Sequence, residues 1–382
     1  MPRSGIREIL DLAVDREDVL RLEIGEPDFP TPPHVIEAAA RAATDGYTKY
    51  TVNRGLPSLR EAIRAKLAAR NGIEASIEQI VVTTGGGTAL METLLALVEP
   101  GEGILISDPA WPNYAMMAAT LKATPIRYPL DREAEFEPDL DVLDALAADP
   151  RAKVLMINSP ANPTGAVWRP ETIERALEIA TRHDLYLLSD EVYEEIVFEG
   201  EHVSPAALDE DGRVVTVFSA SKTYAMTGWR LGYLVASLPL ADLIAKVQEP
   251  VVSCATAVAQ KAAEAALLGP QDCVAVMRDA YRLRRDATVK ALRAADLFVT
   301  RPHGAVYIFA DVSKATDDTR LLARSLVLDH GVAVAPGETF GTRGAGLVRL
   351  SLASAPEVLE DGVKRLAEGV AAWGAKRGAE PR

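Results

Sequence analysis

The sequence predicts an α/β protein with a large domain on a mostly parallel central sheet flanked by helices, and a smaller α+β domain. Two observations support this. Apolar, β-rich runs recur between residues 80 and 236, separated mostly by helical patterns, as in a sheet with helices on both faces. Beyond about residue 255 the chain turns helical and then mixes short strands with helices. We place the large domain at residues 46–285 and the small domain at residues 1–45 plus 286–382.

Composition excludes several classes of protein. The chain has 382 residues, and 41 basic against 55 acidic side chains give a net charge of −14 without a basic stripe, which argues against nucleic-acid or membrane-surface partners. Cys254 and Cys273 are too few for a disulfide framework, and no metal-site spacing occurs. The start of the chain lacks an apolar signal core, and no run is long enough to span a bilayer. We expect a cytoplasmic protein without a metal.

The first 72 residues are predicted to be helices joined by irregular segments. Residues 4–20 suit an amphipathic helix, and helices follow at 34–45 and from Pro57 to Gly72. Between the first two lies LEIGEPDFPTPPHV, where four prolines forbid regular structure and Gly25 permits close backbone approach. This stretch is either a linker or a functional lid. The polar loop YTKYTVNRGL, which contains Tyr50, precedes the third helix.

The predicted sheet determines which loops matter for function. Its strands are expected at residues 80–83, 103–107, 153–158, 185–189, 214–218 and 231–236. Parallel sheets bind ligands beyond the carboxyl ends of their strands. After the first strand, TTGGGTAL opens a helix at Gly86 and Gly87, where backbone N–H groups could bind a phosphate. A tight turn is the alternative, and neither a dinucleotide fingerprint nor a P-loop fits.

The next strand ends carry further candidates. Trp111 in DPAWPNY either stacks on a flat ligand or packs on a neighbouring helix, and Asn162 in NSPANPTGAV either binds a ligand or caps a turn. Asp190 ends a buried run and needs a partner, and Tyr193 follows three residues later.

The stretch VVTVFSASKTYAMTGWRLG holds the strongest chemical signal. A lysine at the tip of a buried strand can form a Schiff base with an aldehyde cofactor, which makes Lys222 a candidate. Arg230, with the hydroxyls of Ser219 and Ser221, could then bind a phosphate. A surface loop with one Lys and one Arg is the alternative.

The C-terminal part is predicted to be the small α+β domain. Strand-like runs LFVT, GAVYIFA, GVAVAPG and GLVRLSLA surround helices at 319–330 and 357–373. Arg349 lies in the last strand, where an inward arginine favours carboxylate binding. The acidic run at 133–141 is interpreted as a solvated loop.

Taken together, these motifs resemble the class I aminotransferases of pyridoxal 5′-phosphate (PLP) fold type I, the aspartate aminotransferase superfamily. The resemblance extends from IGEPDFPTP to VRLSLA, and NPTG followed by DEVY and then SASK, with an arginine eight residues after the lysine, is its most specific part. It implies a PLP cofactor and a homodimer with active sites at the interface.

The resemblance also implies roles for individual residues. Lys222 matches the Schiff-base lysine that then moves protons, Asp190 the carboxylate on the pyridinium nitrogen, and Tyr193 and Asn162 the donors to the ring 3-oxygen. Phosphate binding falls to Gly86, Gly87, Ser219, Ser221, Arg230, and Tyr50 of a second subunit. Trp111 matches the stacking aromatic residue, Arg349 the substrate α-carboxylate binder, and Gly25 the backbone that closes over the substrate, so the proline-rich stretch becomes a lid.

One departure concerns the substrate. Some aspartate-using relatives carry a lysine immediately after the paired glycines, where this chain has Gly87. Lys49 and Arg54 lie near the loop expected to cross the interface, but no replacement cation can be identified. Dicarboxylate specificity is therefore in doubt, and a neutral, aromatic or branched amino acid fits equally.

The predicted function is an aminotransferase that moves an amino group between an L-amino acid and a 2-oxo acid by a ping-pong mechanism, with aspartate and 2-oxoglutarate as one candidate pair. A PLP-dependent lyase, decarboxylase or oxidase is the alternative, because a fold alone does not fix its chemistry. A non-catalytic cofactor sensor is disfavoured by the presence of Lys222, Asp190 and Arg349 together.

Overall fold

The computed structural model describes residues 5–378 and contains an eight-stranded sheet in the order β2-β9-β8-β7-β6-β3-β4-β5. Its strands are β2 Ile80–Thr83, β3 Gly103–Asp108, β4 Thr124–Asp131, β5 Glu137–Pro138, β6 Ala152–Asn158, β7 Tyr186–Asp190, β8 Val214–Ser219 and β9 Gly232–Ala236. The strands from β8 to β4 run parallel, as predicted. β9 is antiparallel to both of its neighbours, β2 and β8.

Two strands of this sheet, β4 and β5, were not predicted, and the interpretation of residues 133–141 as a solvated loop is wrong in part. In β4, Ile126, Tyr128 and Leu130 alternate inward, and β5 pairs with its end. Phe136 is buried, and the buried Glu137 accepts a hydrogen bond from the Arg169 backbone N–H at 2.8 Å. A buried carboxylate needs such partners, so the acidic composition concealed an edge strand.

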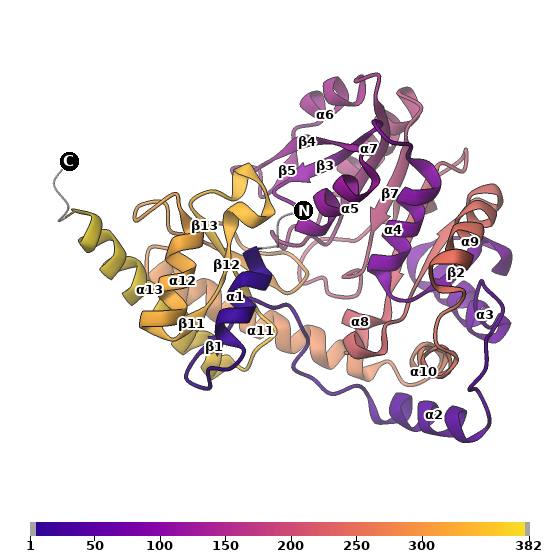
Figure 1. Cartoon of the computed structure of the whole chain (residues 1–382), viewed down its shortest axis with the longest axis horizontal. Helices are drawn as coiled ribbons and strands as arrows, with labels where there is room; N and C mark the ends of the chain where they lie inside the picture. The colour runs from indigo at the N-terminus through magenta and orange to yellow at the C-terminus, as the bar shows by residue number, and fades with distance from the viewer. Residues whose placement is uncertain (1–4, 379–382) are drawn as a thin grey trace.

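The two faces of the sheet are covered by different helices (Figure 1). One face packs on α4 Gly86–Leu97, α5 Pro112–Leu121 and α9 Leu238–Val252, and the other on α6 Leu140–Ala147 and α7 Pro170–Arg182. Successive residues of β3 alternate between these cores, with Ile104 in the first and Leu105 in the second. Burial on both faces explains why the strands read as continuous apolar runs.

A third core lies at the β2 edge of the sheet and includes α2 Pro33–Thr44, α3 Pro57–Lys66 and α10 Ala257–Leu268. α3 continues as a π-helical turn, Leu67–Asn71, and ends at Gly72, whose φ of 67° suits glycine. Helix α2 packs against α10, which lies in the stretch assigned to the large domain. The division at residue 45 stays a prediction.

The remaining elements surround a further core, separate from the three cores around the eight-stranded sheet. They are α1 Gly5–Ala13, β1 Leu20–Arg21, α11 Asp272–Ala294, β10 Tyr307–Asp311, α12 Thr319–His330, β11 Val332–Ala333, β12 Ala335–Pro336, β13 Leu347–Ser351 and α13 Pro356–Gly378. β10, β13 and β12 form an antiparallel sheet, and β1 pairs with β11. The helix predicted over 4–20 is therefore too long, and its first residue lies outside the described part. LFVT contributes only an isolated bridge, Phe298 to Ala310.

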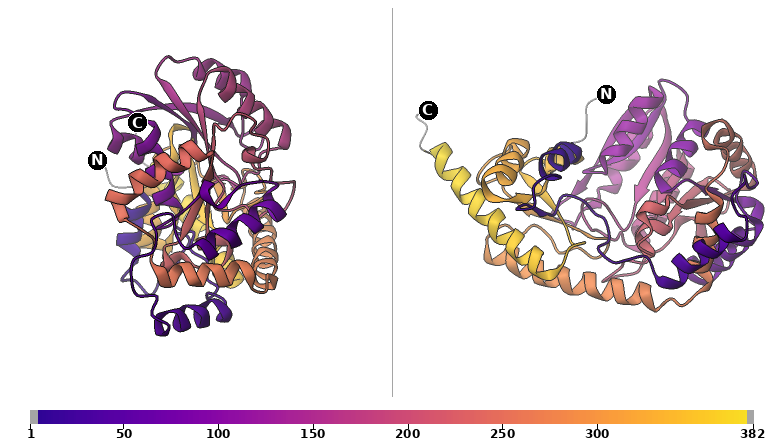
Figure 2. Two further views of the ribbon diagram at one scale, coloured as in Figure 1. Left: turned by 90° about the vertical axis from the view of Figure 1, so that its right-hand side faces the viewer. Right: turned by 60° about the horizontal axis from the view of Figure 1, so that its bottom comes forward.

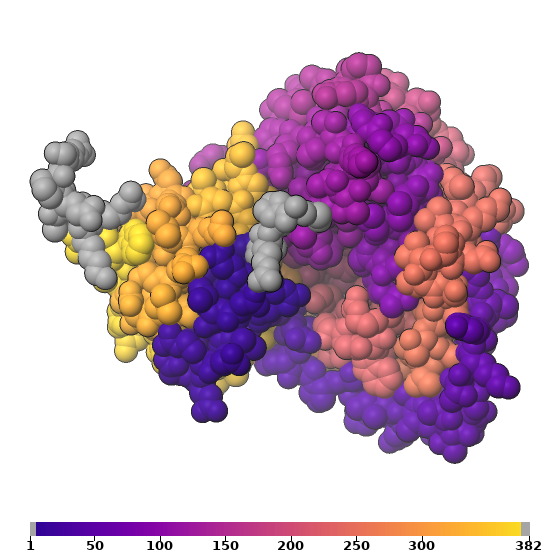
Figure 3. All heavy atoms as spheres, in the orientation of Figure 1, coloured from indigo at the N-terminus to yellow at the C-terminus, as the bar shows by residue number. Residues whose placement is uncertain are grey.

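Short helical segments complete the fold: α8 Ala220–Thr223 and 3₁₀ turns at Ile77–Gln79, Pro205–Ala207, Thr227–Trp229, Gly337–Phe340 and Thr342–Gly344. Helix α11 runs beneath both parts of the molecule (Figure 2, right). The N-terminal segment lies against the C-terminal part and then crosses to the sheet side (Figures 1 and 3). Over the described residues, no helix is long and apolar enough to cross a membrane.

Candidate active site

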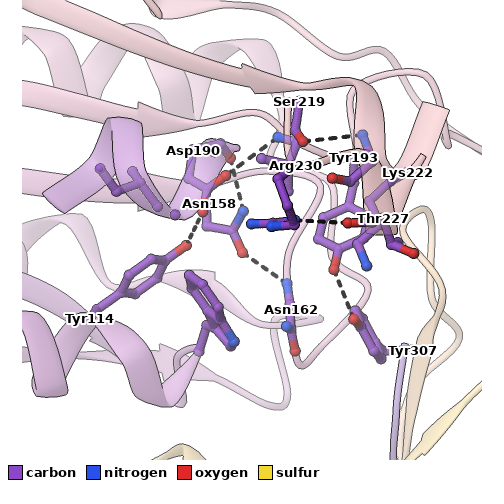
Figure 4. A pocket seen from close by; sticks show the side chains of 16 residues that line it. Tyr114, Asn158, Asn162, Asp190, Tyr193, Ser219, Lys222, Thr227, Arg230 and Tyr307 are labelled. Atoms are coloured by element: carbon purple, nitrogen blue, oxygen red, sulfur yellow. Dashed lines mark hydrogen bonds between the residues drawn. The ribbon is translucent and has the colours of Figure 1, made fainter. Parts of the chain in front are cut away.

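A pocket of about 220 Å³ lies beyond the carboxyl ends of the parallel strands (Figure 4). Ten of the sequence-predicted residues line it: Gly86, Gly87, Trp111, Asn162, Asp190, Tyr193, Ser219, Ser221, Lys222 and Arg230. They come from five strand ends or helix starts spread over about 145 residues of chain. The parallel sheet brings them together, as the strand-end rule predicts.

Asp190 is the buried acid of the pocket. The register of the sheet sets Asn158 of β6 beside it, and the Asn158 side chain donates to the Asp190 carbonyl oxygen at 2.8 Å. Tyr114, on α5, donates from its hydroxyl to the Asp190 carboxylate at 2.6 Å. Burial raises the pKa of Asp190 to about 6, partly offset by that hydrogen bond. No basic side chain of the described residues pairs with this carboxylate, so the pocket holds an acid suited to a cationic ligand group.

The opposite end of the pocket is a cradle for an anion. Helix α4 begins at Gly86, and the first N–H groups of a helix lack acceptors inside it. Gly85 has a φ of 87°, and a Cβ there would lie 2.5 Å from the Arg230 guanidinium, so glycine lets the arginine approach the helix start. Ser219, which caps α8, and Ser221 add hydroxyls. N–H groups, hydroxyls and a guanidinium together form a phosphate site.

Lys222 also lines the pocket and lies in the short helix α8. Its ammonium donates to the Gly25 carbonyl oxygen at 2.6 Å, which brings the proline-rich N-terminal stretch against the pocket. The Tyr193 hydroxyl lies 2.8 Å from that of Tyr307, and both rings are buried. Trp111 borders the pocket and meets Tyr114 edge-on, with centroids 5.5 Å apart.

Arg349 lies behind the pocket on β13 and is 2% exposed. Its two terminal nitrogens donate to the Asn162 side-chain oxygen at 2.9 Å and the Glu23 backbone carbonyl at 2.5 Å, while its Nε has no hydrogen-bond partner in the described structure. No carboxylate of the described residues forms an ion pair with it. Because a buried charge is costly without a counterion, this guanidinium suits an incoming carboxylate.

Three predicted residues do not line the pocket: Gly25 and Arg349, which contact Lys222 and Asn162 from outside it, and Tyr50. Tyr50 is 90% exposed, on the loop before α3, consistent with its expected role in a second subunit. Sequence reasoning missed Tyr114, Asn158 and Tyr307. Tyr114 lies one helical turn after Trp111, and Asn158 ends a predicted strand, so both could have been found from these positions. Tyr307 had no such signal, because its strand belongs to the other core.

Comparison with known proteins agrees with this geometry. Residues 17–366 match the family described as aminotransferase class I and II. The chain is 39% identical over 362 residues to the aspartate/prephenate aminotransferase of Thermus thermophilus, covering 94% of this chain and 92% of that protein. It is 37% identical over 368 residues to aromatic-amino-acid aminotransferase 2 of Thermococcus litoralis, covering 95% and 94%. The structure of the Thermus thermophilus aspartate aminotransferase with maleate superposes with a TM-score of 0.91, at 37% identity over 97% of each chain.

The chain therefore belongs to the class I and II aminotransferases. It has the PLP fold type I architecture, uses PLP and catalyses amino-group transfer; the alternative of a lyase, decarboxylase or oxidase is not favoured. The residues present fit this cofactor: a buried carboxylate without a basic partner among the described residues for the ring nitrogen, an N–H cradle for the phosphate and a lysine in the same pocket.

Proposed function

We propose that this protein is a cytoplasmic homodimeric aminotransferase whose substrates are L-amino acids with neutral or aromatic side chains. The observation that supports it best is that Lys222 and Asp190 line one pocket while Arg349, behind it, contacts the lining residue Asn162, so that three groups with different chemical tasks lie together. When bound, PLP supplies an electron sink and carries the amino group between the two half-reactions of a ping-pong cycle.

The cofactor would be held at four points. The Gly86 and Gly87 N–H groups, Ser219, Ser221 and Arg230 would bind its phosphate. Asp190 would keep a proton on the ring nitrogen, because a buried carboxylate is stabilised by a cation beside it. Trp111 would stack on the ring face, and Tyr193 with Asn162 would donate to the ring 3-oxygen.

The substrate would be held by the remaining residues. Arg349 would bind its α-carboxylate with two parallel hydrogen bonds, and Gly25 would cover it with backbone. Lys222, once free of the aldehyde carbon, would act as the base that moves the proton between the substrate Cα and C4′ of the cofactor. Its contact with the Gly25 carbonyl supports this role, because Gly25 is the residue proposed to cover the substrate.

The substrate side chain would lie toward Gly87 and Trp111. A Cβ built at Gly87 meets only the Trp111 ring, at 3.9 Å, so this corner is open and bordered by an aromatic face. Among the described pocket-lining residues the basic ones are Lys222 and Arg230, and both already have tasks. A neutral or aromatic side chain needs no further cation there.

The test is a substrate panel on the purified holoenzyme with 2-oxo acid acceptors. We expect kcat/KM for phenylalanine or leucine to exceed that for aspartate, and Gly87→Lys to shift the ratio toward aspartate by about tenfold or more, as a new charge-assisted contact would. Gly87→Ala is the matched control for loss of the glycine. A wild-type preference for aspartate would contradict the neutral-substrate assignment.

A dicarboxylic substrate is the second candidate, favoured by the names of the aspartate-using relatives. The cation would then come from a partner subunit. Arg54 already binds the Asp242 carboxylate and the Glu78 carbonyl oxygen, whereas Lys49 is exposed on the same loop. If aspartate is preferred and Lys49→Ala removes that preference selectively, this candidate replaces the first.

The homodimer is supported by the loop at residues 47–56, which exposes Tyr50 and Val52 at 90% and 56%. Mixing two impaired variants tests it. Lys222→Ala should abolish transfer, and Tyr50→Ala should weaken cofactor binding in the partner's site. In a hybrid dimer one site would carry both substitutions and the other neither, so unfolding and refolding the mixture should restore cofactor-saturated sites. If the refolded mixture shows only the average activity and cofactor content of the two single variants, the site is not shared between subunits.

A further inference from the structure

Tyr307, on β10, is outside the set of residues that the sequence motifs identified, yet it lines the pocket and is buried. It contacts three groups that the proposed function uses: the Tyr193 hydroxyl, the Arg349 guanidinium and the Gly25 backbone. Figure 4 shows it on the far side of Tyr193 from Asp190, with the two hydroxyl groups facing each other.

The first contact joins two hydroxyls at 2.8 Å. Burial raises the pKa of Tyr193 well above its ordinary value, and the neighbouring Tyr307 hydroxyl adds to this effect. Tyr193 therefore keeps its proton and can donate it. Tyr193 needs that proton for the cofactor 3-oxygen. Tyr307 then donates to the Tyr193 oxygen, and hydrogen bonds in such a chain strengthen one another.

The second contact is between the Tyr307 ring and Arg349. The guanidinium carbon lies 4.2 Å from the ring centroid, within the range of a cation–π interaction, and Phe340 lies on the same guanidinium at 4.9 Å. With the Asn162 and Glu23 contacts, these rings fix the plane of the guanidinium. A fixed plane is what a two-point hydrogen bond to a carboxylate requires.

The third contact explains the glycine at position 25. A Cβ there would lie 1.9 Å from the Tyr307 hydroxyl oxygen, so a larger residue would force the stretch away from the ring. The Gly25 carbonyl accepts from Lys222 at 2.6 Å, so this close approach also sets where the lysine ammonium lies.

We infer that Tyr307 is a positioning residue that couples the substrate-carboxylate arginine to the hydroxyl donor of the cofactor 3-oxygen. The inference rests on the proposed roles of Tyr193 and Arg349. The Tyr307 hydroxyl orients the Tyr193 proton. The Tyr307 ring holds the Arg349 guanidinium and packs against the Gly25 backbone.

The first test separates the hydroxyl from the ring. In the holoenzyme, the pH midpoint of the visible absorbance of the bound cofactor reports how strongly the 3-oxygen is stabilised as an anion. A lost donor raises this midpoint. We expect Tyr307→Phe to raise it by about half a pH unit to one unit, as for one weakened buried hydrogen bond, and Tyr193→Phe to raise it more.

The double variant Tyr193→Phe/Tyr307→Phe makes the test specific. If Tyr307 acts through Tyr193, the double variant should titrate like Tyr193→Phe alone, because the acting hydroxyl is already gone. An unchanged midpoint in Tyr307→Phe, or shifts that simply add, would overturn the coupling. If Tyr193→Phe itself leaves the midpoint unchanged, the role proposed for Tyr193 fails, and the inference fails with it for that distinguishable reason.

The ring is tested by KM and kcat. Tyr307→Phe keeps the ring, so we expect its KM values within twofold of wild type, whereas Tyr307→Leu should raise KM for every amino acid roughly three- to thirtyfold. Phe340→Leu is the matched control: it removes the other ring from Arg349 and should raise KM without moving the absorbance midpoint. Equal KM effects of Tyr307→Phe and Tyr307→Leu would contradict the role of the ring.

Discussion

The two sides of the pocket are built in different ways. On the cofactor side, Asn158, Asp190 and Ser219 end neighbouring parallel strands, and strand register alone sets two of them side by side. On the substrate side, Gly25, Tyr307 and Arg349 come from three distant stretches, joined through hydrogen bonds and ring contacts. The first side is fixed by one parallel backbone ladder, whereas on the second the β10–β13 ladder holds Tyr307 and Arg349 and individual side-chain contacts join them to the N-terminal stretch and to the cofactor side. Substitutions on the cofactor side should therefore change mainly kcat, and those on the substrate side should change mainly how the substrate is held, and so KM.

The largest effect is expected on the cofactor side, from Asp190→Asn. The amide keeps the shape and can still accept from Tyr114, but it carries no charge to hold the proton on the ring nitrogen. We expect kcat to fall by about a thousandfold, the scale seen when a preorganised electrostatic group is lost. Stopped-flow half-reactions with a saturating amino acid measure this. A loss of tenfold or less would show that Asp190 does not control the ring nitrogen.

The same variant should make the apoprotein more stable, with a defined pH dependence. Below pH 3.8 the Asp190 carboxyl is protonated in both the folded and the unfolded protein. Between about pH 3.8 and about pH 6 the folded protein binds more protons than the unfolded one, so the free energy of unfolding falls as pH rises. Above about pH 6 the buried carboxylate is ionised, and its burial lowers the free energy of unfolding by roughly 3 kcal/mol. Asp190→Asn removes this cost. Urea unfolding of the apoprotein at pH 4.5 and pH 8 should show the gain mainly at pH 8.

On the substrate side, Arg349→Lys should have the next largest effect. Lysine keeps the charge but cannot make two parallel hydrogen bonds to a carboxylate or stack as a plane on Tyr307. KM should rise by about tenfold to a hundredfold for every amino acid alike, since all share the α-carboxylate. Steady-state kinetics with three chemically different amino acids provide the check. A rise in KM for only one of the amino acids would mean that Arg349 contacts the substrate side chain instead of the α-carboxylate.

The smallest effect on activity is expected from Glu92→Met, which changes a buried carboxyl outside the pocket. Glu92 lies on α4, fully buried, and neither carboxylate oxygen has a hydrogen-bond partner in the described structure. Burial raises its pKa from 4.5 to about 7, so its cost to stability grows between those pH values and is complete above about 7. Activity should stay within twofold, while unfolding at pH 8 shows a gain of about 1–3 kcal/mol. Lost activity would mean that Glu92 belongs to the site.

The sequence alone determined the cofactor side. Its six apolar runs predicted the strands, and a parallel sheet places the residues after them at one edge, so Asp190, Asn162 and Lys222 could be assigned before any geometry was known. Local rules placed these residues at one edge, because each lies at or just after the end of its own strand, and the resemblance to class I aminotransferases implied their roles. The edge strands β4 and β5 were missed, because the prolines of the first and the acidic residues around the second hid the pattern of burial.

Only the tertiary structure decided the substrate side. The Tyr307–Tyr193 pair spans 114 residues of chain, and Arg349 reaches Glu23 across 326. No local periodicity encodes which residues from distant parts of the chain pack together, as Tyr193 and Tyr307 do in one buried cluster. That choice is made when β10 and β13 pair and the N-terminal stretch lies across them, so the partners of Arg349 and the reason for Gly25 emerge only from packing.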